Sequence, residues 1–450
     1  MADVTAGIDI GTTSVKAVVA AADGTVVARA RIPHDLVVPA PDRLEHRPDQ
    51  AWRGGVLRAL AEVVAAAEAA DHEVVAVNVA AMVPSLCAVD GDGAALTPGL
   101  LYGDARAGKA DGADPANSGE LVGFLAWCAR EAPEARGYWP AQAVANHALG
   151  GEGVIDTLTA MTAVPLFDYR RWDPDVAAGA GADVDRLPRI VGGDQPAGRV
   201  RDDLPGAGAV LGGGTIDAFA EQVVAGADSV GDVLVICGTT LITWAVIPEW
   251  REVEGLWTIP HSAPGHTMIG GASNAGGLFL DRVRRLVGNG PAGAAVDDPR
   301  RVPVWAPYVR GERTPLHDPD RRAGLHDFDL THDAAAVRRA AFEAAGFVVR
   351  HHLDLAEVAP ERIVATGGGS QSADWVQALA DCTGLPVDVV AVPEGAALGA
   401  AFMARVAAGL ETSAPDARRW ARTGRRVEPD PAWVGPVADR YHRFRFLTAT

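Results

Sequence analysis

The start of the chain shows a pattern of apolar and polar positions that predicts adjacent β-strands. Apolar stretches at residues 6–10 and 14–20 flank a Gly-Thr-Thr segment, and a third stretch at 25–30 follows Asp23-Gly24. Asp-Gly is a common hairpin turn, so the three stretches are predicted to pair with one another. The pattern then predicts a helix over about 50–70 and strands at 74–79 and 85–89.

The middle of the chain has a weaker pattern. Between about residues 110 and 201 it predicts a loop-rich insertion or cap, with a helical patch near 121–130. Regular patterns return later, and they predict a helix over 334–350, a strand at 363–365 and a helix over 375–382.

A weak internal repeat divides the chain into halves. Residues 8–19 recur in outline as residues 235–246, and both copies place Gly-Thr-Thr between two apolar strands. The offset between the two glycines is 238 − 11 = 227 residues in a chain of 450. The repeat predicts two similar domains, residues 1–228 and 229–450. Chance similarity between two β-hairpins is the alternative.

Composition and charge exclude several classes of protein. Hydrophobic residues make up 48% and charged residues 22% of the chain, as in globular proteins that dissolve in water. A formal net charge of −18 argues against a nucleic-acid partner. No apolar stretch is long enough to cross a membrane, and the first residues lack the features of a signal peptide. We therefore expect a cytoplasmic protein without a membrane or nucleic-acid partner.

The two Gly-Thr-Thr segments are candidate phosphate-binding turns. Glycine lets the backbone approach an anion closely, and consecutive N–H groups with two hydroxyls can donate to phosphate oxygens. Lys16 would add a positive charge beside the first turn, and Asp9 could hold Mg²⁺ directly or through water. Each segment alone is better explained as an ordinary tight turn, whereas the two together favour phosphate binding.

Two further glycine-rich segments carry candidate chemistry. Residues 367–369 are three glycines between a predicted strand and a predicted helix, an arrangement that suits a nucleotide or an ordinary helix cap. Asp217 follows a second run, Gly212-Gly213-Gly214, where a helix is predicted to begin. It could accept the proton of an attacking hydroxyl, or it could simply stabilise the start of its helix.

Taken in order, these segments resemble the FGGY carbohydrate kinase family of the actin-like ATPase superfamily. The resemblance spans nearly the whole chain and rests on eight segments in the family's order and approximate spacing: Asp9-Ile10-Gly11-Thr12-Thr13-Ser14, Asp104-Ala105-Arg106, Gly213-Gly214-Thr215-Ile216-Asp217, Cys237-Gly238-Thr239-Thr240, Gly271-Ala272-Ser273-Asn274-Ala275-Gly276-Gly277, Gly311-Glu312-Arg313-Thr314-Pro315, Gly367-Gly368-Gly369-Ser370, and Glu394-Gly395-Ala396-Ala397-Leu398-Gly399-Ala400-Ala401.

The resemblance implies an α/β fold of two ribonuclease-H-like domains, each a mixed five-stranded sheet flanked by helices, with a hinged cleft. It implies ATP and Mg²⁺ as cofactors, and a small sugar, polyol or sugar acid as substrate. Asp217 matches the family's catalytic base and Asp9 its metal-binding position. The other implied contacts are with phosphate (Gly11, Thr12, Thr13, Lys16, Gly238, Thr239, Thr240), nucleotide (Gly276, Gly368, Gly369) and sugar (Met82, Val83, Asp104, Arg106, Asp217).

Two departures from the family concern the substrate half. Residues 81–85 are Ala-Met-Val-Pro-Ser, whereas at this position xylulose kinases have a sequence similar to Met-His-Gly and glycerol kinases one similar to Arg-Glu. The stretch 104–156 is also shorter than expected. The sequence therefore does not predict which sugar is the substrate.

Alternatives to a carbohydrate kinase are a pseudokinase that senses nucleotide or sugar, an actin-like phosphotransferase with another substrate, and a filament protein. A homodimer through helix 334–350 also stays open, although packing of that helix within the monomer is simpler.

Overall fold

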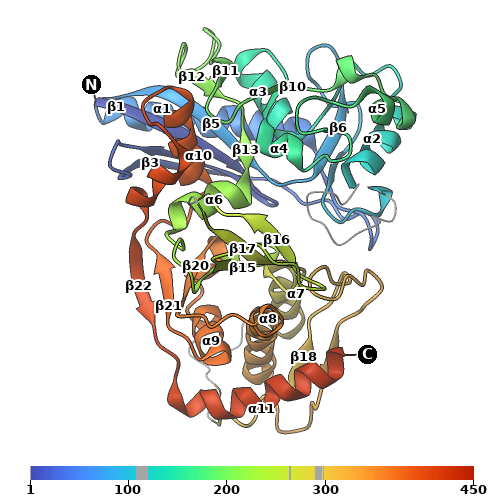
Figure 1. The fold of residues 1–450 in the computed structure, drawn as a ribbon, viewed down its shortest axis with the longest axis vertical. Coiled ribbons are helices and arrows are strands. Elements are labelled where there is room, and N and C mark those ends of the chain that lie inside the picture. The colour runs from blue at the N-terminus through green and yellow to red at the C-terminus, as the bar shows by residue number, and fades with distance from the viewer. Residues whose placement is uncertain (1, 108–119, 263–264, 289–295, 297, 450) are drawn as a thin grey trace. The chain divides into compact units, whose positions relative to one another are not determined.

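The computed structural model describes residues 2–107, 120–262, 265–288, 296 and 298–449 (Figure 1). The chain forms two compact units. Unit 1 comprises Met1–Val224 and Glu394–Trp420, and unit 2 comprises Ala225–Pro393 and Ala421–Thr450. Among the described residues, no helix combines the length and the apolar character needed to cross a lipid bilayer.

Unit 1 is built on a seven-stranded mixed sheet with the order β11-β12-β5-β1-β2-β3, and β13 also pairs with β5. Strands β1, β2 and β3 form the predicted antiparallel meander, while β5 and β12 run parallel to β1. Their bounds are β1 Ala2–Ile10, β2 Ser14–Ala20, β3 Val26–Pro33, β5 His72–Ala81, β11 Pro196–Arg199, β12 Val210–Gly212 and β13 Thr215–Ile216.

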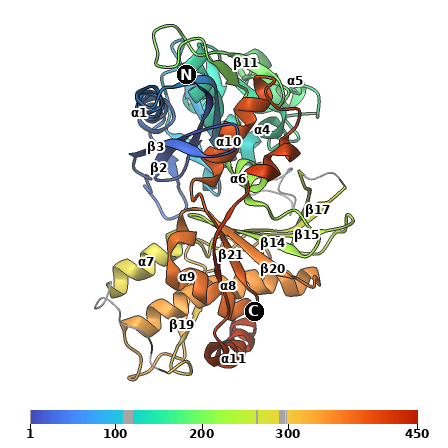
Figure 2. The ribbon, with the colours of Figure 1, turned by 90° about the vertical axis from the view of Figure 1, so that its left-hand side faces the viewer.

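Helices cover both faces of this sheet, which explains why β1 is buried from Val4 to its end. Helix α1 (Gly55–Ala69) packs against β2 through a contact between Gly55 and Val15. Helix α10 (Gly395–Ala407) packs against β1 through a contact between Ala397 and Gly7. Because alternate residues of a strand face opposite sides, these two contacts lie on opposite faces. Figure 2 shows the same arrangement.

Helix α10 changes the domain boundaries expected from sequence. The structure divides near the expected position, at Val224 and Ala225, but one division does not describe the chain because residues 394–420 return to unit 1. In Figure 1, α10 carries a colour from the end of the chain and lies beside the blue strands of its beginning. All of its residues are buried. Its small side chains, with Gly7, permit this close approach to β1.

The helical patch expected near 121–130 is confirmed by α2 (Glu120–Glu131), but the expectation that the rest of 110–201 is loop-rich is wrong for its described part. Residues 108–119 lie outside the described residues. The segment also contains α3 (Ala141–Gly150), α4 (Thr157–Met161) and α5 (Pro174–Gly179). Most of α3 is buried, so the helix has no polar face to produce a period of 3.6 residues. The remaining strands of unit 1 are short: β4 Glu45–His46, β6 Ser85–Val89, β7 Gly99–Leu101, β8 Gly137–Trp139, β9 Val154–Asp156 and β10 Arg189–Val191.

Unit 2 repeats the topology of unit 1 in a sheet with the order β16-β17-β15-β14-β20-β21-β22. Strands β14, β15 and β17 form an antiparallel meander, and β20 and β21 run parallel to β14. The five-stranded sheet expected from the resemblance is thus present in both units, and further strands extend each to seven. The bounds are β14 Asp232–Cys237, β15 Leu241–Ile247, β16 Trp257–Pro260, β17 Thr267–Ser273, β18 Val304–Ala306, β19 Gly324–His326, β20 Arg362–Thr366, β21 Val387–Val390 and β22 Thr423–Val427.

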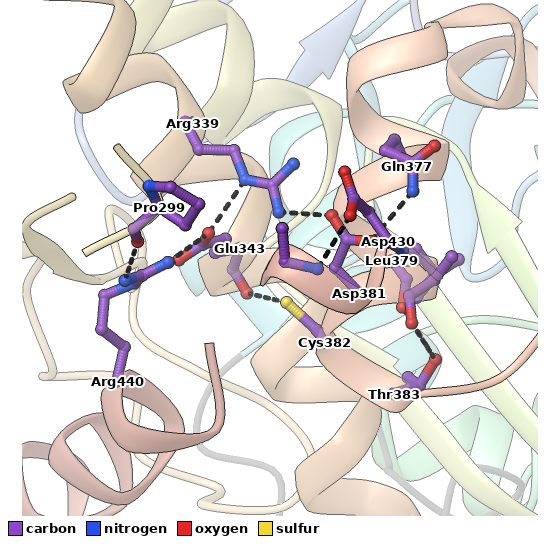
Figure 3. Close-up of polar contacts among 12 residues, drawn as sticks. Pro299, Arg339, Glu343, Gln377, Leu379, Asp381, Cys382, Thr383, Asp430 and Arg440 are labelled. Atoms are coloured by element: carbon purple, nitrogen blue, oxygen red, sulfur yellow. Dashed lines mark hydrogen bonds and ion pairs between the residues drawn. The ribbon is translucent and has the colours of Figure 1, made fainter. Parts of the chain in front are cut away.

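A buried ionic network joins three helices of unit 2, α8 (Ala334–Ala356), α9 (Ala373–Thr383) and α11 (Pro431–Thr448) (Figure 3). The other α-helix in the described part of unit 2 is α7 (Gly277–Val287), whereas α6 (Asp217–Ala225) ends at the division between the units. Arg440 of α11 donates two hydrogen bonds to Glu343 of α8, at 2.7 and 2.8 Å. Arg339 joins Glu343 to Asp381 of α9, at 2.9 and 2.7 Å. Most of α8 is buried inside unit 2, which favours packing within the monomer for this helix.

Candidate active site

The first Gly-Thr-Thr turn joins β1 to β2 and lies beside a lysine–aspartate ion pair. The two strands place Asp9 directly opposite Lys16, and Lys16 Nζ lies 3.0 Å from Asp9 Oδ2. The carboxylate of Asp9 raises the pKa of Lys16 above its ordinary value, against the opposing effect of burial. The ammonium group is therefore charged at neutral pH, next to the turn predicted to bind phosphate.

Asp217 lies at the same edge of the sheet. It follows β13, which pairs with Ala80 and Ala81 at the end of β5, and Ala80 is also the partner of Asp9 across β1 and β5. The backbone N–H of Ala218 donates to Asp217 Oδ1 at 2.7 Å. Unit 1 thus places the first turn, Asp9, Lys16 and Asp217 at one edge of its sheet, as expected if they form one site.

The electrostatic surroundings of Asp217 disfavour its ionised form. Burial is the largest effect and the negative charge of Asp9 the next, and together they raise the pKa of Asp217 from its ordinary value of 3.8 to about 6. The Ala218 N–H and the Lys16 ammonium oppose this change. A carboxylate with a pKa close to neutrality is a better proton acceptor than an ordinary one, and it is still mostly ionised at pH 7.

Two buried amides that sequence reasoning missed hold the segment before Asp217. Asn78 Oδ1 accepts a hydrogen bond from the Gly214 N–H at 2.9 Å. Gln142 Nε2 donates to the carbonyls of Ala81 and Thr215, at 3.1 and 3.2 Å. Lone amides in buried elements give no sequence signal. The three-glycine run was the available clue, since a Cβ atom at Gly212 would lie 2.6 Å from Asn78 Oδ1.

The carboxylates near the first turn fit a magnesium ion that arrives with a nucleotide. Asp9 and Asp217 are both acidic and lie at one edge of the sheet, next to the turn. Within the described ranges, no group of three or more His, Cys, Asp or Glu side chains is placed to hold a metal. Magnesium usually takes one or two protein carboxylates and completes its shell with phosphates and water. The donor set therefore suits Mg·ATP better than a permanently bound ion.

The predicted sugar contacts are mostly engaged within unit 1. Arg106 donates to both carboxylate oxygens of Asp104, at 2.8 and 2.6 Å, and the Leu44 N–H donates to Asp104 Oδ2 at 2.7 Å. Met82 is buried in the core. Val83 lines a largely apolar hollow of unit 1. In this structure, Asp104 and Arg106 are bonded to one another, and of the two apolar residues only Val83 lines the hollow.

The second Gly-Thr-Thr turn joins β14 to β15 in unit 2, at the position that the first turn occupies in unit 1. Gly276 packs directly behind it, because a Cβ atom there would lie 2.7 Å from the Thr240 Cα. Gly276 therefore supports this turn by letting another segment approach its backbone.

The Gly367–Gly369 segment follows β20 and lies next to the last residue of β14. Gly367 has a φ of +83° and approaches the Cys237 carbonyl, while Gly369 packs against the Trp375 ring. A Cβ atom at Gly368 would meet no atom within 4 Å. Gly368 is thus the member of this run that faces open space, and the other two have packing roles.

Glu312 joins two of the segments on which the resemblance rests. Its carboxylate accepts hydrogen bonds from the Ser273 hydroxyl at 2.7 Å and from the Asn274 N–H at 3.0 Å. Burial is the main cause that raises the pKa of Glu312 to about 7. These bonds link residues 271–277 to residues 311–315 next to the second turn.

Comparison with known proteins gives consistent matches along the chain. The N-terminal domain of the FGGY family of carbohydrate kinases matches residues 4–111, and the C-terminal domain of that family matches residues 233–408. A xylulose kinase of Klebsiella pneumoniae is 27% identical over 447 residues, which cover 91% of this chain and 91% of that protein. A gluconokinase of Bacillus subtilis is 26% identical over 457 residues, with coverages of 90% and 87%.

A solved structure agrees with these matches. The crystal structure of a xylulose kinase from Rhodospirillum rubrum has a TM-score of 0.78 and 26% identity to this chain, and the comparison covers 99% of this chain and 98% of that one. The two matched family ranges together span more than half of the sequence.

Proposed function

Because the chain belongs to the FGGY family of carbohydrate kinases and has that family's two actin-like domains, we propose that Asp217 is the general base of its ATP-dependent phosphotransfer. The substrate is a small sugar, polyol or sugar acid. The observation that carries this proposal is the position of Asp217, whose pKa is raised to about 6, at the same sheet edge as the first turn and the Asp9–Lys16 pair.

Asp217 accepts the proton of the attacking hydroxyl in this proposal. Phosphoryl transfer needs little covalent help from the protein, and most of the catalysis comes from positioning and from stabilising charge. One well-placed base contributes a factor of about 10²–10⁴ to the rate. The hydrogen bonds from Asn78 and Gln142 to the backbone before Asp217 fix the point at which the strand ends and α6 begins.

The phosphates of ATP are assigned to the two Gly-Thr-Thr turns, Gly11–Thr13 on unit 1 and Gly238–Thr240 on unit 2. Lys16 adds a charge that Asp9 keeps positive, and Asp9 is the ligand proposed for Mg²⁺. When bound, Mg²⁺ supplies charge neutralisation at the phosphate oxygens. Gly368 is the proposed nucleotide contact among residues 367–369, because it faces open space.

The names of the relatives make xylulose and gluconate the first substrates to test. The loop at residues 82–84 does not decide between them, because Met82 and Val83 offer no hydrogen bonds to sugar hydroxyls. We assign these two residues a role in the shape of the sugar site. Asp104 and Arg106 form a fixed polar wall, since they are bonded to each other and Arg106 is also paired with Glu45 at 2.7 Å.

The test is turnover of purified protein with Mg·ATP and D-xylulose, D-ribulose, D-gluconate or glycerol, followed by ADP release. We expect turnover on one of these compounds, and at least a 100-fold lower kcat in Asp217→Asn with unchanged binding of Mg·ADP. Asp202→Asn, at an exposed position of the same unit, is the matched control and keeps full activity. ATP binding without turnover would instead favour a nucleotide sensor, and absence of ATP binding would refute the proposal.

A further inference from the structure

In both Gly-Thr-Thr turns, the carbonyl groups of the glycine and the first threonine accept hydrogen bonds, but the donors differ between the two turns. In unit 2, the Gly277 N–H donates to the Gly238 carbonyl at 2.9 Å, and the Leu278 N–H donates to the Thr239 carbonyl at 3.1 Å. Both donors are backbone groups in the first turn of α7. The start of a helix thus holds the glycine carbonyl and the first threonine carbonyl of the second turn.

In unit 1, two histidine rings occupy the corresponding places. His34 Nε2 lies 3.0 Å from the Gly11 carbonyl, and His46 Nε2 lies 2.8 Å from the Thr12 carbonyl. A carbonyl oxygen only accepts hydrogen bonds, so both Nε2 atoms must carry the proton. The two rings meet edge to face, with their centroids 4.6 Å apart.

Trp52 fixes the state of His46. The indole Nε1–H of Trp52 donates to His46 Nδ1 at 2.9 Å, which requires an unprotonated Nδ1. With Nδ1 as acceptor and Nε2 as donor, His46 is neutral and has one defined tautomer. His46 and Trp52 are fully buried. Burial is the main cause that lowers the pKa of His46 to about 4, which agrees with a neutral ring.

This arrangement matters because the orientation of the peptide planes decides whether a backbone turn presents N–H groups to a phosphate ligand. When donors hold the carbonyls of a turn on one side, the peptide planes are fixed, and their N–H groups point away from those donors. A turn that is fixed before ligand binding does not lose conformational freedom when phosphate arrives. The helix start supplies such donors in unit 2, and side chains must supply them in unit 1.

We propose that His34 and His46, with Trp52 behind His46, are positioning residues that hold the first Gly-Thr-Thr turn in its phosphate-binding form. This inference rests on the proposed function, because it assigns these residues to the ATP site of that function. None of the three residues belongs to the segments on which the family resemblance rests.

The decisive pair of variants is His46→Gln and His46→Leu. Glutamine can place Oε1 near the position of Nδ1 and Nε2 near that of the imidazole Nε2, so it can accept from Trp52 and donate to Thr12. Leucine fills similar space but does neither. We expect His46→Leu to raise the KM for Mg·ATP and the Kd for Mg·ADP about tenfold or more. We expect His46→Gln to stay within about threefold of the wild type, and the KM for the sugar to stay unchanged in both.

Three outcomes separate this inference from the proposed function. If the wild type does not bind Mg·ATP, both fall. If the wild type turns over and His46→Leu keeps its KM for Mg·ATP, the inference is overturned while the proposed function stands. A purely structural role would lower the melting temperature and the active fraction of His46→Leu without changing the KM of the remaining active protein, and that result also overturns the inference.

A second measurement does not depend on activity. Protein labelled with ¹⁵N-histidine is examined by long-range nitrogen–proton NMR at pH 7, with His46→Gln used to assign the signal. We expect His46 as the neutral tautomer with the proton on Nε2, and a changed Nδ1 signal in Trp52→Phe, which lacks the indole donor. A proton on Nδ1 in the wild type would contradict the proposed bonding.

Discussion

Replacing Asp217 by asparagine is expected to make the protein more stable while it abolishes the proposed activity. In the folded chain, burial and the charge of Asp9 raise the pKa of Asp217 to about 6. In the unfolded chain the carboxyl returns to an ordinary value near 3.8. Ionisation is therefore harder in the folded state, and the ionised carboxylate destabilises it.

The size of this effect follows from the difference between the two pKa values. A difference of one pKa unit corresponds to about 1.4 kcal/mol, so the full effect is about 3 kcal/mol. The Asp217 side chain is not completely enclosed, and water screens part of the interaction, so we expect about 1–3 kcal/mol. Asparagine keeps an oxygen that can accept from the Ala218 N–H, and it removes the charge.

The dependence on pH has a definite sign. Below about pH 4 the carboxyl is protonated in both states, so asparagine gives little advantage. As the pH rises from about 4 to 6, the unfolded chain loses this proton and the folded chain keeps it, so the advantage of asparagine grows. Above about pH 6 the advantage is complete and constant.

The assay is thermal or denaturant-induced unfolding of wild type and Asp217→Asn, without ATP or Mg²⁺, at pH 4.5 and pH 8. The gain in melting temperature should be several degrees at pH 8 and clearly smaller at pH 4.5. Asp202→Asn, at an exposed carboxylate of the same unit, should show no such gain at either pH. A variant that is less stable than wild type at pH 8, or an effect that does not change with pH, would refute the reasoning.

Three other results are expected. The kcat/KM of the wild type should fall about tenfold between pH 7 and pH 5 as the proposed base is protonated, and a flat profile over this range would count against that base. Gly399→Ala should lower both kcat and stability, because its Cβ would clash with the Ala220 carbonyl of α6, whereas Gly179→Ala has open space and should be neutral in both assays. Arg440→Leu should cost about 2–4 kcal/mol in urea unfolding, because it removes one of two cations from buried Glu343, and a loss below about 0.5 kcal/mol would show that this contact contributes little.

Local sequence patterns were sufficient to predict the parts of the fold with strong alternation. The meander around Gly11–Thr13 and its repeat around Gly238–Thr240 both appear in the structure, each followed by parallel strands. The return of α10 to unit 1 was not predictable from pattern. It depends on Gly7 and Gly399, which permit contacts between residues far apart in the chain.

The candidate site was predicted where its residues lie in glycine-rich segments, and was missed where single buried side chains support them. Asp9, Lys16 and Asp217 stand next to such segments, which marked them. His46 and Asn78 lie in ordinary strands, and only the three-dimensional structure shows that His46 bonds the backbone of the first turn and Asn78 the backbone before Asp217. A polar residue that acts on a distant backbone carbonyl or N–H leaves no periodic signal in the sequence.

The most direct test of the central claim is ³¹P NMR of the purified protein with Mg·ATP and, in turn, D-xylulose or D-gluconate. We expect the γ-phosphate signal of ATP to decay while ADP and a new sugar phosphomonoester signal appear in equal amounts, and Asp217→Asn to show neither change. Formation of inorganic phosphate without a phosphomonoester would contradict phosphotransfer to these sugars. A phosphomonoester formed at an undiminished rate by Asp217→Asn would contradict its role as the base.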